Sequence, residues 1–211
     1  MNYTQLSQAI QDYTEVNEAS FVSYIPTFVQ NVERLVAQTV QLPVFRKAVT
    51  GAFTPLDQYI TLPADFISIF SLADVDATGA FQFMKNKDVN YIREAYPSPA
   101  SVGLPTCYAL FNSCSVLVGP TPDAAYVLEM HYQYYPPSIV DVGTTWLSTN
   151  FPNVLLWGAV LEAYAYLKGD ADLLNLYSAK YQEALGLLKQ LGDGKDRMDT
   201  YRTVQVRDQV K

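Results

Sequence analysis

Reactive and metal-binding side chains are scarce in this sequence, which has one histidine and two cysteines among 211 residues. A serine–histidine hydrolase needs a nucleophile held beside its histidine, and no Gly-x-Ser-x-Gly turn is present to hold one. One histidine and two cysteines also cannot supply the four ligands of a structural zinc site. We therefore expect no metal, and we expect His131 to pack at a surface or interface rather than to act in catalysis.

Loops that bind phosphate or calcium are also missing. Neither Gly-x-x-x-x-Gly-Lys nor Gly-x-Gly-x-x-Gly occurs. Residues 74–79 copy the first half of an EF-hand loop, but the twelfth position is Lys85, where a bidentate glutamate is required. A β-turn in which Gly79 supplies a positive φ angle explains the stretch better. We therefore expect no cofactor.

Charged residues are few, at 17% of the chain, and the net charge is −7. Tight DNA binding draws its affinity from Lys and Arg on phosphates, so an acidic chain suits DNA that passes without sticking. No apolar run reaches membrane-spanning length, and the N-terminus lacks the order of a signal peptide. We expect no membrane contact, and a protein that stays in the cytosol or leaves it within an assembly.

Hydrophobic residues make up 49% of the chain and include 16 tyrosines. This composition is not that of a disordered protein. Two interpretations of it stay open: a surface largely covered by other subunits, or a tyrosine-rich monomer. The tyrosines are not interleaved with basic residues as in a nucleic-acid stacking surface, so they fit subunit contacts better.

The two cysteines, Cys107 and Cys114, flank a short turn. If Asn112 and Ser113 form the turn of a hairpin, Cys107 faces about Val118 and Cys114 faces about Phe111. The two thiols are then not cross-strand neighbours. We expect free and mostly buried thiols in a cytosolic setting.

Two helices are predicted near the C-terminal end, between Asn150 and Gly192. The first, residues 152–167, is apolar on nearly every side and should be surrounded by protein. Gly169 and Asp170 supply a break and an N-cap for the second. That helix carries a one-sided stripe, and Gly192 and Gly194 are expected to end it. The stripe consists of Leu174, Tyr177, Tyr181, Ala184, Leu185, Leu188 and Leu191.

Residues 3–40 predict two further helices, with apolar residues three to four positions apart. Thr4 is the expected cap of the first, and Asn17 or Ser20 opens the second. Pro26 either kinks the second helix or marks its true start. With the C-terminal pair, these helices predict a helical layer of about four helices.

The stretch between the helical pairs changes to a two-fold period, typical of strands. The clearest strand has an apolar face that includes Leu128 and a polar face that includes His131. Two short helices are expected, at residues 63–67 and 88–96. The expected strands are Tyr59–Leu62, Phe81–Met84, Thr106–Phe111, Ser115–Val118 and Ala125–Tyr135.

The predicted fold class is therefore α+β. Residues 1–40 and 146–192 supply the helical layer, and residues 41–145 form a β-rich insertion. Residues 193–211 mix both charge signs and alternate β-branched residues, which favours an extended C-terminal arm over a helix. For a free subunit, a disordered terminus is the competing interpretation.

Three stretches together resemble the head-to-tail adaptor (connector, tail-tubular or gatekeeper-type) proteins of tailed, especially short-tailed, bacteriophages. The first is Tyr59-Ile60-Thr61-Leu62-Pro63-Ala64-Asp65-Phe66-Ile67, similar to the family's Y-x-LP-x-DF segment. The second is Gly119-Pro120-Thr121-Pro122-Asp123-Ala124-Ala125-Tyr126, which leads to Tyr134-Tyr135-Pro136-Pro137. The third is Trp146-Leu147 followed by Phe151-Pro152-Asn153-Val154-Leu155-Leu156, Ala159, Glu162 and Ala163.

The resemblance implies a structural virion protein with no catalytic residues. In the family, subunits form a ring, usually twelve-fold, below the portal protein, support the tail nozzle or another tail protein, and line the channel through which DNA passes. The implied assembly site is the host cytoplasm. The resemblance also implies that the arm binds the portal, through Tyr201, Arg202, Val204, Val206, Arg207 and Val210.

Two alternatives stay open beside the adaptor. One is another neck or tail component, such as a completion or terminator protein. The other is a small enzyme or ligand-binding module that uses the β-rich insertion, although no coherent set of catalytic residues supports it.

Overall fold

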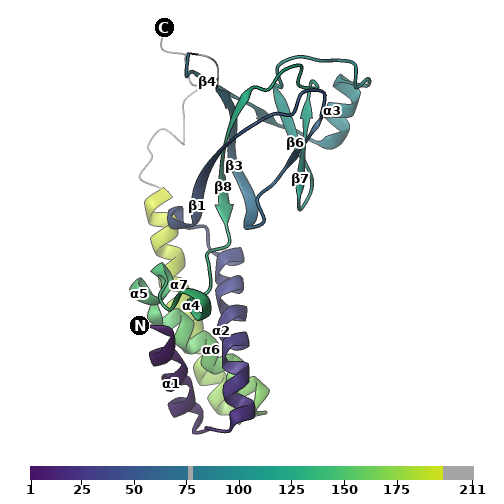
Figure 1. Ribbon diagram of the computed structural model, residues 1–211. Helices are drawn as coiled ribbons and strands as arrows, with labels where there is room; N and C mark the ends of the chain where they lie inside the picture. Colours follow the sequence, from purple (N-terminus) through teal and green to yellow (C-terminus); the bar gives the residue numbers. More distant parts are fainter. Residues whose placement is uncertain (76–77, 197–211) are drawn as a thin grey trace. The chain divides into compact units, whose positions relative to one another are not determined.

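The computed structural model describes residues 1–75 and 78–196, with side chains to residue 192 (Figure 1). The chain forms two compact units, each with its own core. Described residues 1–43 and 136–196 build a helical unit, and described residues between 44 and 135 build a β-rich unit. The structure confirms the predicted α+β fold, in which both ends of the chain supply helices and the middle supplies strands.

The helical unit is organised around helix α6, which contacts α1, α2, α5 and α7 (Figure 1). All four predicted helices are present, and two short helices, α4 and α5, precede α6. The helices are α1 (Tyr3–Thr14), α2 (Ala19–Thr39), α4 (Ile139–Val142), α5 (Trp146–Asn150), α6 (Pro152–Tyr166) and α7 (Ala171–Asp196).

Helix α6 is buried because it is apolar around its whole circumference, as predicted. Its buried positions are Val154, Leu155, Gly158, Ala159, Val160 and Ala163. Gly158 allows its neighbours to approach closely: a Cβ atom there would lie 2.6 Å from Cγ1 of Val32 on α2 and 3.0 Å from Cε2 of Tyr181 on α7. The absence of a side chain at this position lets three helices meet.

The start of α1 is set by Asn2 rather than by Thr4, which corrects the sequence-based expectation. The Asn2 side chain accepts a hydrogen bond from the Gln5 N–H, and the Gln5 side chain accepts one from the Asn2 N–H. This reciprocal pair is a capping box, with Gln5 at its third helical position. The α-ammonium group of Met1 donates a hydrogen bond to the Ser148 carbonyl oxygen at 3.0 Å, which links the start of α1 to α5.

Helix α2 begins without a side-chain cap. Its N-cap is Glu18, so neither Asn17 nor Ser20 opens the helix. Pro26 lies inside the helix, seven residues after Ala19, and does not mark its start. A strongly apolar face, which includes Phe28, stabilises α2 through tertiary packing where the local start signals are weak.

The turn between α6 and α7 agrees with the prediction, but the end of α7 does not. The Asp170 side chain accepts from the Asp172 N–H, as an N-cap residue does. Helix α7 passes Gly192 and continues to Asp196. The expectation that Gly192 ends the helix was wrong, because this glycine sits where a Cβ would lie 2.9 Å from the Gln41 carbonyl oxygen. Close packing, not helix termination, accounts for it.

The β-rich unit contains two four-stranded sheets. Sheet A has the order β1-β8-β3-β4, and sheet B has the order β2-β7-β6-β5. Helix α3 (Val89–Ala95) packs on β6 and β7. The strands are β1 (Arg46–Ala52), β2 (Tyr59–Thr61), β3 (Phe66–Val75), β4 (Phe81–Phe83), β5 (Lys85–Asn86), β6 (Cys107–Asn112), β7 (Ser115–Gly119) and β8 (Val127–Tyr134), and a 3-10 turn, η1 (Pro43–Phe45), precedes β1.

The two sheets share one apolar core. It contains Phe53, Leu62, Leu72, Met84, Tyr108, Val116, Val118, Leu128, Met130 and Tyr132. The predicted alternation of the last strand is confirmed, since Leu128, Met130 and Tyr132 are buried while the residues between them are not. One face of each sheet therefore points inward, and the other face points away from this core.

Two elements of this unit differ from the sequence-based expectation. Residues 63–67 form no helix: a turn at Ala64 and Asp65 leads into β3, which starts at Phe66. The Asp65 carboxylate, which suggested a helix start, instead accepts from the Tyr132 hydroxyl at 2.9 Å and from the Lys47 ammonium. Strands β1 and β3 were missed, because β1 lacks an apolar alternation and the start of β3 was assigned to the helix.

The cysteine hairpin is shifted by one residue from its predicted register. Asn112 pairs with Ser115, so the turn is formed by Ser113 and Cys114, and Cys107 faces Gly119 rather than Val118. Both cysteines are free. Cys107 is buried as expected, whereas Cys114 is exposed at the turn.

The positive φ angle expected at Gly79 is confirmed at 85°. Gly79 lies between β3 and β4, which pair as antiparallel neighbours.

Candidate interaction surfaces

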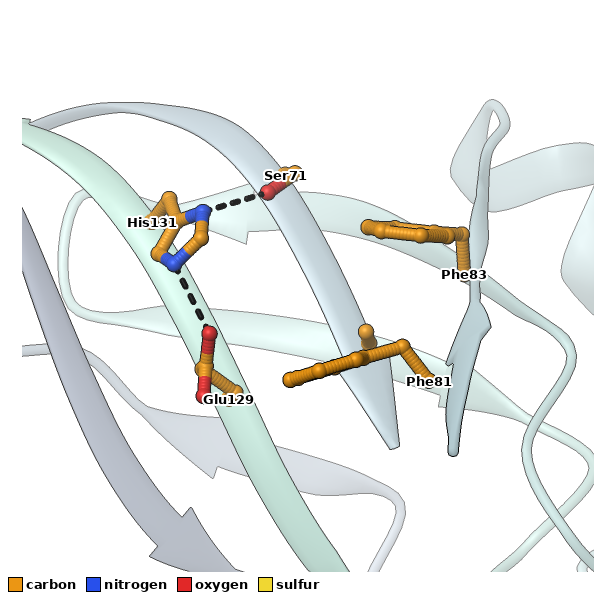
Figure 2. Close-up of a pocket in the computed structure, with 6 residues that line it drawn as sticks. Ser71, Phe81, Phe83, Glu129 and His131 are labelled. Carbon is orange, nitrogen blue, oxygen red and sulfur yellow. Dashed lines mark hydrogen bonds and ion pairs between the residues drawn. The ribbon is translucent and has the colours of Figure 1, made fainter. Parts of the chain in front are cut away.

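The outer face of sheet A is the first candidate site. It is defined here by the lining of a shallow pocket: Ser71, Ala73, Phe81, Phe83, Glu129 and His131. The strand register brings these residues together, because Ala73 lies between Glu129 on β8 and Phe83 on β4. Figure 2 shows the two phenylalanine rings on the same face as His131.

His131 connects two polar side chains on this face. Its Nδ1 lies 3.1 Å from the Ser71 hydroxyl, and its Nε2 lies 2.8 Å from a Glu129 carboxylate oxygen (Figure 2). Ser71 and His131 are cross-strand partners, and Glu129 is two residues from His131 on the same side of β8. The sequence analysis placed His131 on the polar face of the strand that also contains Glu129, but it missed Ser71, which comes from the register of the unpredicted strand β3.

The serine–histidine–carboxylate order invites comparison with a hydrolytic triad, but the geometry differs. In a triad the serine bonds to Nε2 and the carboxylate to Nδ1, whereas here the two partners are exchanged. Ser71 lies on a strand rather than on a tight turn that exposes a nucleophile. The His131 side chain is 42% exposed, so water reaches it freely. The arrangement holds the imidazole in place and fits a packing surface better than a reaction centre.

The apolar part of this face is unusually open. Phe81 and Phe83 are 52% and 61% exposed, and their rings stack at 6.3 Å between centroids. The pocket between them and His131 is only about 110 Å³. A cavity of this size is below the usual range for small-molecule sites. Exposed stacked aromatic rings on the outer face of a sheet instead suit contact with another macromolecule.

A second aromatic surface lies on sheet B. Tyr59 and Phe111 pack edge to face at 5.3 Å, and both are exposed. The Arg93 guanidinium of α3 donates to the Tyr59 hydroxyl and to the side chain of Gln58. Tyrosine and arginine together are typical of protein interfaces.

The helical unit presents exposed tyrosines at two places. Tyr13 packs edge to face on Trp157, over which the Lys180 ammonium lies at 4.3 Å from the ring centroid. Tyr24 and Tyr166 form a second pair, with centroids 5.1 Å apart. Tyr13, Tyr24 and Tyr166 are each between 42% and 47% exposed. Part of the chain's tyrosine content therefore lies on the surface of this unit.

Helix α7 has exposed leucines in addition to its buried stripe. Buried Tyr177, Tyr181 and Leu188 confirm the stripe that its sequence predicted. The exposed leucines are Leu173, Leu176 and Leu187. These leucines are three and eleven residues apart, a spacing that places them on one side of a helix, so the sequence could have indicated a second apolar surface. The sequence analysis assigned only one apolar side to this helix and so missed them.

No group of three or more His, Cys, Asp or Glu side chains in the described part of the chain is arranged to hold a metal ion. Among the described residues, no helix combines the length and apolar character that a bilayer crossing requires. The predicted portal-binding residues lie outside the described residues. They are Tyr201, Arg202, Val204, Val206, Arg207 and Val210.

Comparison with known proteins agrees with surfaces built for assembly. A search among curated proteins finds no match. The family model described as SU10 adaptor protein matches residues 1–207, nearly the whole chain. This match confirms the resemblance drawn from the sequence motifs. The chain therefore belongs to the SU10 adaptor protein family, a family of phage head-to-tail adaptors.

Proposed function

We propose that this adaptor forms a ring below the portal of a bacteriophage capsid, connects the capsid to the tail, and lines the channel through which DNA leaves. The family match over residues 1–207 carries this proposal. As a member of a phage adaptor family the protein is a component of the virion. The ring, the portal contact and assembly in the host cytoplasm are the further steps that we propose.

The exposed apolar side chains support a ring. Phe81 and Phe83 on sheet A and Tyr59 and Phe111 on sheet B are four large aromatic residues that water contacts in the single chain. Monomeric soluble proteins rarely expose contiguous apolar patches of this kind. Two different apolar patches on one subunit allow head-to-tail contacts, and such contacts close into a ring when their rotation closes. A twelve-fold ring is the number that the family resemblance implies.

The acidic charge supports passage of DNA without binding. The chain carries −7, and a ring multiplies that charge around its channel. Negative charges on the channel wall repel the DNA phosphates at short range, which keeps DNA from adhering to the wall. We propose that DNA moves through the ring without sequence-specific contact.

The C-terminal arm is the segment that we propose for portal attachment, and a tail nozzle or another tail protein is the proposed partner on the other side of the ring. Residues 202–207 combine two arginines with two valines, so one short stretch offers both charge and apolar contact. Segments that order on contact bind only when their partner is present. This property would delay ring formation until a portal is available.

Light scattering and negative-stain electron microscopy test the proposal. The isolated protein should be monomeric or weakly associated, and addition of the purified portal should convert it to rings seated on portal particles. A portal assembled from an unrelated phage serves as the control and should leave the protein unassembled. A tight dimer that the cognate portal does not alter would contradict the proposal.

A further inference from the structure

Strand β1 is an open edge of sheet A. It pairs with β8 on one side, and no other strand in the described part of the chain pairs with it. Six of its seven residues are exposed. The Phe53 N–H donates to the Tyr126 carbonyl, and antiparallel bonds alternate, so the backbone groups of Ala48, Thr50 and Ala52 point away from β8. An exposed edge of this length is a template for another strand.

A groove runs beside this edge, between β1 of sheet A and β2 of sheet B. It has a volume of about 310 Å³ and reaches Phe53, Leu128 and Met130, which belong to the core of the β-rich unit. Val49 and Gly51 form its β1 wall, and Ile60 contributes from β2. The floor of this groove is therefore apolar, and the unpaired backbone groups of β1 lie along one side of it.

We infer that this groove is a docking site for an extended strand, and that residues 200–210 of the C-terminal segment of the same copy are its occupant. The segment would pair with the edge of β1 as an additional strand and cover the groove. Main-chain hydrogen bonds would give affinity, and alternate side chains would give specificity, as in other cases of strand addition.

The sequence of the segment fits this groove. Val204, Val206 and Val210 occupy even positions, which share one face of an extended strand, and Asp208 on the same face separates Val210 from the other two. The odd positions between them are all polar: Thr203, Gln205, Arg207 and Gln209. The part of the even-numbered face formed by Val204 and Val206 can therefore enter the apolar groove, while Asp208 would lie beyond the groove and the opposite face would stay in water. The groove wall at Gly51 leaves room for a β-branched side chain, because a Cβ there would meet nothing within 4 Å.

Charge favours the same pairing. Residues 197–211 contain four basic and two acidic side chains, a net charge of +2. Since the whole chain carries −7, residues 1–196 carry −9. The groove itself is bordered by Asp57, which is exposed. A basic strand on an acidic body is attracted at long range before its valines reach the groove.

Docking in the groove uses the same residues as the proposed portal contact, so the two exclude each other. A portal would have to draw the segment out of the groove. The inference concerns the isolated protein and needs no portal. Its failure would therefore leave the proposed adaptor function untouched, and the reverse also holds.

Amide hydrogen exchange, followed by NMR on the full chain, tests the inference. The variant Val204→Asp/Val206→Asp places charges on the groove-facing side of the segment. The matched control Thr203→Asp/Gln205→Asp introduces the same charges on the opposite side. We expect the amides of Ala48, Thr50 and Ala52 to exchange at least tenfold faster in the first variant than in the control, with the central strand β7 unchanged in both.

A synthetic peptide of residues 197–211 provides the second readout. Added to the full-length Val204→Asp/Val206→Asp protein, it should restore slow exchange along β1 in a saturable manner. A peptide that carries the same two aspartates should not. Equal exchange of the β1 edge amides in the two variants, or no effect of the peptide, would overturn the inference.

Discussion

Gly158 provides a direct test of how the helical unit is packed. It sits where α6 contacts both α2 and α7, and a Cβ atom would lie 2.6 and 2.9 Å from the two methyl groups of Val32 and 3.0 Å from the Tyr181 ring. Val32 is stiff at χ1 and cannot rotate away within a helix. The substitution Gly158→Val must therefore push helices apart. Overpacking of this kind costs about 1–3 kcal/mol, and three close contacts place the expected loss at about 2 kcal/mol or more.

Gly186 is a matched control on α7. A Cβ atom there would meet nothing within 4 Å, so Gly186→Val introduces the same side chain into open space. Valine is a better helix former than glycine by a few tenths of a kcal/mol, and this gain is common to both variants. The difference between the two variants then isolates the packing cost at Gly158.

Tryptophan fluorescence is a suitable assay because both tryptophans, Trp146 and Trp157, belong to the helical unit. A loss of about 2 kcal/mol should lower the Tm of this unit by about 8 °C if it unfolds independently, whereas Gly186→Val should match the wild type or exceed it slightly. Equal Tm values for the two variants would refute the proposed three-helix contact at Gly158.

Three further predictions concern charge, surface and the C-terminal segment. Burial raises the pKa of Glu33, although hydrogen bonds from Ser138 and the Ile139 N–H act against it. The contribution of this shift to folding stability is thus complete below the unfolded pKa of 4.5 and is lost as the pH rises through the higher folded pKa. Relative to Glu33→Gln, the wild type should lose stability as the pH rises above 4.5, and an unfolding free energy in urea that changes equally with pH in both proteins would argue against this. The variant Phe81→Ser/Phe83→Ser should change stability by no more than about 0.5 kcal/mol, because both rings are exposed, yet weaken ring assembly on the portal; unaltered assembly in light scattering would remove sheet A from the contact. Deletion of residues 199–211 should leave the tryptophan transition unchanged and weaken portal attachment in a pull-down, whereas unfolding of the truncated chain would mean that the segment belongs to the core.

Elements with strong periodicity could be predicted from the sequence. The all-round apolar pattern of α6 and the alternation of β8 both reflect burial, because buried positions are occupied by apolar residues. Both elements occur within a residue or two of their expected bounds. The helix expected at residues 88–96 is also present as α3, and the Asp88 side chain caps it by accepting from the Asn90 N–H.

Elements whose residues serve contacts distant in the sequence could not be predicted. Pro63 and Asp65 resemble a helix start, but Asp65 is held by Lys47 and Tyr132, 18 and 67 residues away. Strand β1 carries no apolar alternation because it lies at an edge. Pairing between distant strands also hid Ser71, one of the two partners of His131. Ser71 meets it only through the pairing of β3 with β8, which no local pattern records.

The cysteine hairpin gives the unaltered protein a second natural probe. Burial raises the pKa of the Cys107 thiol, so this side chain is both covered and poorly ionised, whereas Cys114 is exposed at its turn. A maleimide dye would thus attach to the β-rich unit at one position, while indole emission reports the helical unit. The order in which the two halves of the molecule melt, or their melting together, can be observed without changing a single residue.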